Sequence, residues 1–146
     1  MEALSYHTGN DLDLDEVIAL YVASTLGERR PVNDRETMAA MLAHANLIIT
    51  ARDGARLIGI ARSMTDFVYV AYLSDLAVHH AYQRQGVGVE LIRRTREALT
   101  PGARIVLLSA PAAVQYYPRI GFTQHPSAWV LGPGDPFPIE QKDVHP

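Results

Sequence analysis

A short glycine-containing segment in the middle of the chain has the residue types of an anion-binding turn. The polar stretch 83–85 precedes Gly86 and Gly88, and a helical pattern begins at Val87. The first N–H groups of a helix have no partners inside it, and the helix dipole favours an anion there. Glycine lets an anion approach these amides and tolerates positive φ. The segment is therefore a candidate site for a phosphate or diphosphate.

Two familiar glycine motifs do not fit this segment. The dinucleotide fingerprint GxGxxG would need glycine where the chain has Leu91, and the P-loop sequence Gly-Lys-Ser/Thr is absent. A tight strand-to-helix turn without any ligand would also use Gly86 and Gly88. The glycines alone therefore leave both interpretations open.

Asp75 and Tyr117 are the candidate titratable groups elsewhere. Asp75 is the only charge in the apolar stretch 67–78. It could act as a general base, or it could cap a backbone group or pair with an arginine. Tyr117 could equally be a core aromatic on a short helix. The six histidines form no His-x-x-x-His pair and cysteine is absent, so we expect no metal site.

Three helices are predicted by apolar spacing and capping residues. The first begins near Asp13, and its apolar stripe consists of Val17, Ile18, Tyr21 and Val22. The second is capped by Asn33, and one face carries Met38, Met41, Leu42 and Ala45. The third runs from Val87 toward Pro101-Gly102, with Val87, Leu91, Thr95 and Ala98 on one side. Each stripe is expected to pack on a sheet.

The strands are predicted from runs of β-branched and aromatic residues. Leu47–Thr50 and Leu57–Ala61 flank Asp53-Gly54 and should form a hairpin. The stretch 67–78 reads as a central strand, and 104–109 as a strand parallel to it, joined through the third helix. We further expect a short helix over 112–116, strands near 122–124 and 128–131, and an irregular tail over 132–146.

Composition narrows the class of protein. The 146 residues are nearly half apolar and suit one domain, 1–146. A net charge of -3 argues against a nucleic-acid binder. No signal-peptide pattern opens the chain, and no apolar run reaches the roughly 18 residues of a membrane helix. We expect a cytoplasmic protein without a membrane or nucleic-acid partner. Exposed edge strands near the C-terminus leave a homodimer open.

Two motifs together resemble the GNAT acetyltransferase family. The stretch Leu76-Ala-Val-x-x-x-Tyr82-Gln83-x-x-Gly86-Val-Gly88 is similar to its [QR]-x-x-G-x-[GA] signature and the strand before it. Downstream, Tyr116-Tyr117-Pro-Arg-Ile-Gly121-Phe122 is similar to its FYxxxGF segment, in register with the first motif. The resemblance covers roughly residues 3–131. The chain departs from the family at His80, often proline, and at Ala110, often an asparagine that helps to hold the cofactor.

The resemblance implies an α/β GNAT-like fold, with a mixed sheet of six to seven strands flanked by about four helices. It implies N-acetyl transfer from acetyl-CoA to a small-molecule or protein amine by direct attack. The strands predicted over 67–78 and 104–109 would splay apart to admit the pantetheine arm of acetyl-CoA. The cofactor-binding residues would be Leu76, Ala77, Val78, Gln83, Arg84, Gln85, Gly86, Val87, Gly88 and Val89.

The same resemblance makes Tyr117 the acid that protonates the departing CoA sulfur, with Asp75 as a candidate base. A backbone N–H near Val78 would stabilise the oxyanion, and Arg84 would meet the ribose phosphate. No metal is implied. Two alternatives stay open, a catalytically silent acyl-CoA-binding or regulatory domain and an α/β domain for another phosphate ligand.

Overall fold

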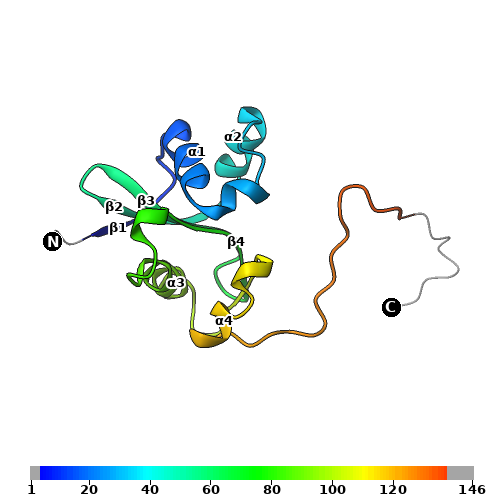
Figure 1. Ribbon diagram of the computed structural model, residues 1–146. Coiled ribbons are helices and arrows are strands. Elements are labelled where there is room, and N and C mark those ends of the chain that lie inside the picture. The colour runs from blue at the N-terminus through cyan, green and yellow to red at the C-terminus, as the bar shows by residue number, and fades with distance from the viewer. Residues whose placement is uncertain (1–3, 138–146) are drawn as a thin grey trace, which may run out of the picture. The chain divides into compact units, whose positions relative to one another are not determined.

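Five strands form one mixed sheet in the order β1-β2-β3-β4-β5 (Figure 1). The computed structural model describes residues 4–137. The strands are β1 (Ser5–Thr8), β2 (Leu47–Asp53), β3 (Arg56–Thr65), β4 (Val70–Val78) and β5 (Arg104–Val106). Neighbouring strands are antiparallel except β4 and β5, which are parallel. The mixed α/β class is confirmed, although the described residues hold fewer strands than the predicted six to seven.

Contacts divide the chain into two units, residues 1–110 and 111–146. The first holds the sheet and the helices α1 (Leu14–Ala23), α2 (Arg35–Ala43) and α3 (Val87–Glu97), with two 3₁₀ segments, η1 (Thr25–Arg29) and η2 (His80–Tyr82). The second holds η3 (Pro111–Ala113) and α4 (Tyr116–Arg119). No helix among residues 4–137 has the length and apolar character needed to cross a bilayer.

Side-chain caps start the first two helices. The Asp13 carboxylate accepts the Glu16 N–H at 3.2 Å, as predicted. Helix α2 is capped by Asp34 rather than by Asn33, because the Asp34 carboxylate accepts both the N–H and the hydroxyl of Thr37. Strand β1 was not predicted, since its four residues are mostly exposed and lack an apolar pattern.

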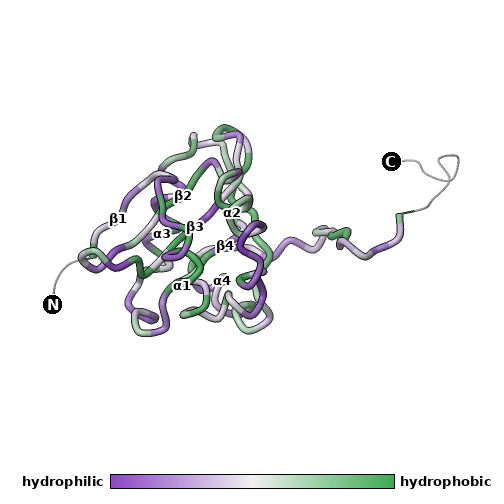
Figure 2. The backbone as a smooth tube through the Cα atoms, turned by 90° about the horizontal axis from the view of Figure 1, so that it is seen from above, coloured by the Kyte–Doolittle hydropathy of each residue, from purple (hydrophilic) through white to green (hydrophobic). Residues whose placement is uncertain are grey.

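The three helices of the first unit cover both faces of the sheet: α1 and α2 one face, α3 the other (Figure 1). Seen from above, the tube of this unit mixes hydrophobic and hydrophilic stretches, as elements with one buried face should (Figure 2). The predicted stripe of α3 is buried through Val87, Leu91 and Thr95. Gly59 of β3 permits this packing, because a Cβ there would lie 3.1 Å from Leu91 and from Val87.

The face of the sheet under α1 and α2 carries an apolar cluster. Its buried members are Val17, Leu20, Tyr21, Met38, Leu42, Ala45, Ile48, Leu57, Ile60 and Ala77. Val22, predicted in the α1 stripe, is instead 62% exposed. Along β4 the burial alternates, so that Ala71, Leu73, Asp75 and Ala77 are buried. The predicted period of two is confirmed, and it places Asp75 on the same face as Ala77.

Strand β4 begins at Val70 and not at the predicted Phe67. The Asp66 carboxylate accepts the N–H groups of residues 68, 69 and 70, and Phe67 has a φ of 69°. These bonds fold the segment into a turn, because amides held by a side chain are not offered to a neighbouring strand.

Strand β5 is parallel to β4, as predicted, but it ends at Val106 rather than near Ser109. The two strands pair only through Val70, Ala71 and Tyr72 of β4. Beyond Tyr72 the pairing ends, and β4 continues for six residues without a described partner on that side. The early end of the pairing agrees with the expected splay.

Two predictions in the second unit are wrong. The short helix begins at Tyr116 instead of ending there, since Pro118 falls in the first turn, where its missing N–H costs no helical bond. The stretches 122–124 and 128–131 form no strand among the described residues, although Trp129 and its apolar neighbours favour one. A strand needs a neighbouring strand to pair with, and the described residues provide none for these two stretches. Of the predicted irregular tail, residues 138–146 lie outside the described part.

Candidate active site

The start of α3 is built as an anion-binding turn. Its N-cap, Gly86, has a φ of 82° in the left-handed region, and no side chain caps it. Arg84, two residues earlier, is also left-handed, with a φ of 64°. Left-handed and right-handed residues in succession turn neighbouring N–H groups toward one concave face. The conformation thus favours glycine at 86 and leaves the cap position to another partner.

The N–H groups of the first turn can donate to such a partner. Glu90 makes the first bond of the helix, donating its N–H to the Gly86 carbonyl at 3.0 Å. Within residues 4–137 no acceptor pairs with the N–H groups of Val87, Gly88 and Val89. A Cβ built on Gly86 meets no atom within 4 Å, so the space before these amides is open. Polar backbone left unpaired at a helix start is an anion site.

The end of β4 is tied to this turn by His79 and Gln83. The His79 Nδ1 accepts the Ala81 N–H at 3.0 Å, and the Gln83 Nε2 donates to the Val78 carbonyl at 3.1 Å. Histidine is often partly exposed. His79 is instead 8% exposed, and its Nε2 lies 2.9 Å from Arg56 Nη2. Burial and the Arg56 charge lower the pKa of His79, which favours the neutral form of the ring.

The splay leaves backbone groups of β4 exposed beside this turn. His79 donates its N–H to Ile58 of β3 at 2.9 Å. Because bonding alternates along a strand, Ala77 also faces β3, whereas Leu76 and Val78 point to the other side. No strand of the described chain pairs with that side beyond Tyr72. Leu76 and Val78 therefore present backbone groups to an edge where an extended ligand could add as a strand.

Asp75 lies at the centre of a buried polar group that we call the Asp75 cluster: Asp75, Tyr21, Arg30 and Arg62. One carboxylate oxygen accepts from the Tyr21 hydroxyl and from Arg62 Nε, each at 2.6 Å. The other accepts from Arg30 Nε, also at 2.6 Å. The cluster joins α1 and the segment after η1 to β3 and β4. Pairing with arginine, one of the two interpretations of Asp75, is thus observed.

Opposing effects act on the pKa of Asp75. Burial raises this pKa. The hydrogen bond and charge of Arg62 lower it, as do the bonds from Tyr21 and Arg30. Together these partners outweigh burial, so the net shift is downward. A carboxylate with a lowered pKa is a weak base. The catalytic role of Asp75 stays a prediction, and these contacts favour a structural one.

Tyr117 lies on α4, in the second unit. Its ring packs edge-on against Tyr116 and Phe122, with centroids 5.2 and 5.4 Å apart. Its carbonyl accepts the Phe122 N–H at 3.0 Å, which closes the predicted segment from Tyr116 to Phe122 into a local turn. Burial, and then repulsion from Tyr116, raise the pKa of Tyr117. The phenol is therefore protonated at neutral pH.

The arginines after the glycines divide into two groups. Arg93 and Arg94 both bond Glu90, and Arg93 also bonds Glu97. The hydrogen bonds from Arg93 and Arg94 lower the pKa of Glu90 to about 2. These two arginines are thus engaged on the helix surface, whereas Arg84 is exposed in the anion-binding turn. This favours Arg84 over the other two for a phosphate.

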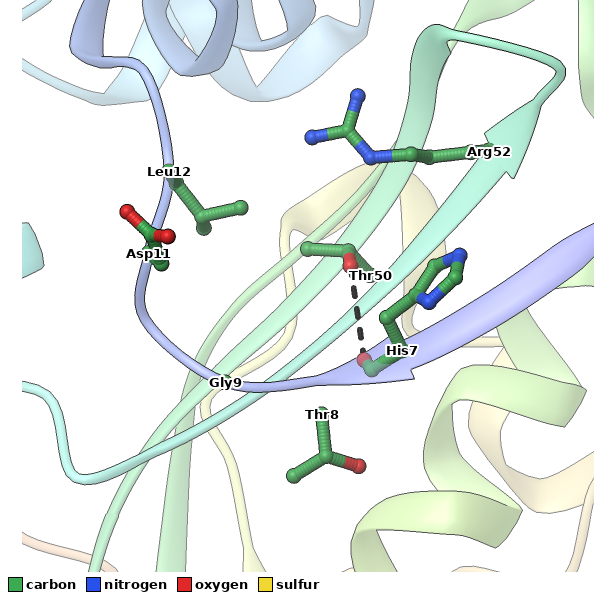
Figure 3. Close-up of a pocket in the computed structure, with 7 residues that line it drawn as sticks. All are labelled: His7, Thr8, Gly9, Asp11, Leu12, Thr50 and Arg52. Atoms are coloured by element: carbon green, nitrogen blue, oxygen red, sulfur yellow. Dashed lines mark hydrogen bonds between the residues drawn. The ribbon is translucent and has the colours of Figure 1, made fainter.

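A separate hollow of about 230 Å³ lies where β1 meets β2 (Figure 3). It is lined by His7, Thr8, Gly9, Asp11, Leu12, Thr50 and Arg52. The Arg52 guanidinium bonds Glu16 at 2.9 Å and the Ala55 carbonyl at 3.0 Å. The hollow is at the β1 edge of the sheet, opposite to the open edge of β4.

Residues 4–137 contain no group of three or more acidic, His or Cys side chains suited to a metal.

Arg30, Arg62 and Tyr21 are the site residues that sequence reasoning missed. Tyr21 was predicted in an apolar stripe, and no role was predicted for Arg30 or Arg62. The signal was Asp75 itself, because a buried carboxylate requires a cationic partner. Nothing in the spacing says which of the 13 Lys and Arg residues supplies it.

Replacing Asp75 by Asn tests the cluster. We expect Asp75→Asn to lower the free energy of unfolding at pH 7 by about 3–5 kcal/mol, because it leaves two arginines without their counter-charge. The lowered pKa makes this stabilisation present above the unfolded pKa of about 3.9 and lost as pH falls through the folded value. Urea unfolding from pH 7 to pH 3 should show the two proteins converging. Glu97→Gln, at an exposed ion pair, is the control and should change little.

Known proteins are similar to this chain in sequence and in fold. Residues 23–130 match the family described as the acetyltransferase (GNAT) domain. Histone acetyltransferase TAP1 of Glycine max is 27% identical over 140 residues, covering 86% of this chain and 58% of that protein. An uncharacterized N-acetyltransferase ycf52-like protein of Prochlorococcus marinus is 37% identical over 73 residues, covering 49% and 41%. The chain thus spans about half the length of these curated relatives.

Solved structures share the fold. A probable acetyltransferase of Staphylococcus aureus aligns with a TM-score of 0.71 at 21% identity, covering 89% of this chain and 98% of that one. Aminoglycoside N-acetyltransferase AAC(6')-Iy in complex with CoA aligns with a TM-score of 0.68 at 17% identity, covering 89% and 94%. The family match covers well over half of the residues and both motifs lie within it. The chain belongs to the GNAT acetyltransferase family.

Proposed function

We propose that this protein transfers the acetyl group of acetyl-CoA to an amine. The observation that carries the proposal is the unpaired first turn of α3 beside the open edge of β4, in a chain of the GNAT family. An anion site and a free strand edge in succession fit a ligand with a diphosphate at one end and an amide-containing arm at the other.

The diphosphate binds the N–H groups of Val87, Gly88 and Val89, and Arg84 meets the ribose phosphate. The arm then runs from this turn along β4 toward its amino end, since α3 follows the carboxyl end of that strand. Its amides pair with the backbone groups of Leu76 and Val78. All of these contacts but the arginine are to the main chain, so the cofactor is recognised by conformation rather than by side-chain identity.

Transfer takes place by direct attack of a neutral amine on the thioester carbonyl carbon. A carbon–nitrogen bond forms, and the carbon–sulfur bond then breaks to release CoA. A backbone N–H of the open edge, at Leu76 or Val78, stabilises the oxyanion. The amine loses one proton and the departing sulfur gains one.

Tyr117 supplies the proton to the sulfur. The raised pKa of its phenol supports this role, because the donor must be protonated at neutral pH. An alkyl amine has a pKa near ~10.4, so a base or ordered water must take its proton. Asp75 is the predicted base. Its bonds to two arginines and a tyrosine favour water as the immediate acceptor.

The names of relatives support an amine acceptor of either kind. One curated relative is a histone acetyltransferase, and another solved structure is an aminoglycoside acetyltransferase in complex with sisomicin, at a TM-score of 0.67 and 20% identity. None of these comparisons supports a catalytically silent domain. A screen of primary amines with acetyl-CoA, followed by thiol release, decides between the two: CoA binding without turnover of any amine would favour the silent domain.

Gly86→Asn tests the anion site while leaving the turn intact. Asn tolerates positive φ and its Cβ meets no protein atom, so the fold should persist while the side chain occupies the open space. We expect CoA affinity to fall about tenfold or more, which corresponds to roughly 1.4 kcal/mol. Isothermal calorimetry measures it. Gly54→Asn makes the same change at a φ of 60° in the β2–β3 turn and should leave affinity unaltered. Equal affinity in all three proteins would contradict the site.

Tyr117→Phe tests the acid. We expect turnover with any accepted amine to fall about 100-fold, because the proton donor is lost, while the CoA dissociation constant stays near that of the wild type. Tyr116→Phe removes a neighbouring hydroxyl from the same helix and should retain activity. Steady-state kinetics at neutral pH compare the three proteins. Wild-type turnover in Tyr117→Phe would remove the residue from this role.

A further inference from the structure

Arg30 lies at the reactive end of the open edge. Its Nη2 donates to the Ser74 carbonyl at 2.7 Å, and its Nε to Asp75 at 2.6 Å. Ser74 precedes Leu76 by two residues, about 7 Å along the strand. In the proposed function the arm runs along the edge from the α3 turn, so its thioester end approaches Leu76 and Ser74. The guanidinium is therefore beside the place where an acceptor must approach.

The Asp75 cluster holds one positive charge in excess. Asp75 contributes one negative charge, and Arg30 and Arg62 contribute two positive charges. Burial and the adjacent carboxylate raise the pKa of Tyr21, so its phenol is neutral. Among the described residues, Asp75 is the only acidic group in contact with either arginine. An uncompensated charge in a largely buried cluster is a site for an anion.

The excess charge is accessible at Arg30. The Arg62 side chain is 6% exposed, whereas the Arg30 side chain is 20% exposed. A guanidinium has five N–H donors. Arg30 uses three, on Asp75, the Ser74 carbonyl and the Arg29 carbonyl, so two remain without a described acceptor. Three bonds hold the group in place, which makes it a preorganised donor for a carboxylate.

We propose that the acceptor is an amine bearing a carboxylate on or near the carbon that carries the nitrogen, and that Arg30 binds this carboxylate. The inference rests on the proposed function. It defines the acceptor as a zwitterionic, amino-acid-like molecule, which leaves simple polyamines and aminoglycoside-type polycations as poor substrates. The bound carboxylate neutralises the excess charge of the Asp75 cluster and directs the amine toward the edge near Leu76.

Matched pairs of amines test this selectivity in the full-length wild type. Each pair differs only in the carboxylate: tyramine with tyrosine, tryptamine with tryptophan, phenethylamine with phenylalanine, and ethanolamine with serine. Thiol release from acetyl-CoA gives kcat/KM for each. We expect the carboxylated member to be favoured by about tenfold or more in any pair that fits, as for a charge-assisted bond. An equal or reversed preference would overturn the inference.

Two variants then assign the preference to Arg30. Arg30→Met should abolish it, with a rise in KM for the carboxylated amine and little change in CoA affinity. Arg30→Lys keeps the positive charge but lacks the planar guanidinium that can donate two parallel bonds. This variant should retain part of the preference for the carboxylated amine. Arg29→Met, at the adjacent exposed arginine, is the control and should keep the wild-type ratio. An unchanged ratio in both Arg30 variants would overturn the assignment. Failure to acetylate any amine, with CoA still bound, would instead contradict the proposed function.

Discussion

One buried carboxylate links the segment after η1 and the helix α1 to the sheet. Asp75 would be costly in the interior without partners, and its two oxygens are satisfied by side chains from three other parts of the chain. Tyr21 belongs to α1, Arg62 to β3, and Arg30 follows η1. Besides the apolar packing, Asp75 therefore ties α1 and the segment after η1 to β4, the strand that presents the backbone edge.

The two halves of the proposed site use different physical means. The proposed cofactor side consists of backbone groups, at the first turn of α3 and along Leu76 and Val78, whose direction is set by glycine and by strand alternation. The proposed acceptor side consists of charged side chains around Asp75. A backbone site tolerates sequence change, since any residue carries an amide, whereas a charged site changes its preference with one substitution.

The turn at the start of α3 and the alternation of β4 could be predicted from the sequence because their information is local. The glycines, the helix start at Val87 and the alternation of β4 all depend on neighbours in the chain. The partners of Asp75 could not be predicted, since Arg30 lies 45 residues and Tyr21 54 residues away in the chain. Charge alone does not say which arginine pairs with the carboxylate. The missed β1 and the absent strands over 122–124 and 128–131 have a related cause, because a strand exists only where a partner is in place. The start of β4 was misplaced by a local competitor, the Asp66 carboxylate.

The open edge of β4 is shorter than the strand that carries it. Arg30 covers the Ser74 carbonyl at one end, and Gln83 covers the Val78 carbonyl at the other. Between them, Leu76 alone keeps both of its outward backbone groups without a partner among residues 4–137. Exposed strand edges invite pairing with other chains, and natural sheets guard against it with charged or obstructing side chains. A window of this size is too short to recruit a foreign strand, so the protein can hold a gap in its sheet without becoming prone to aggregation there.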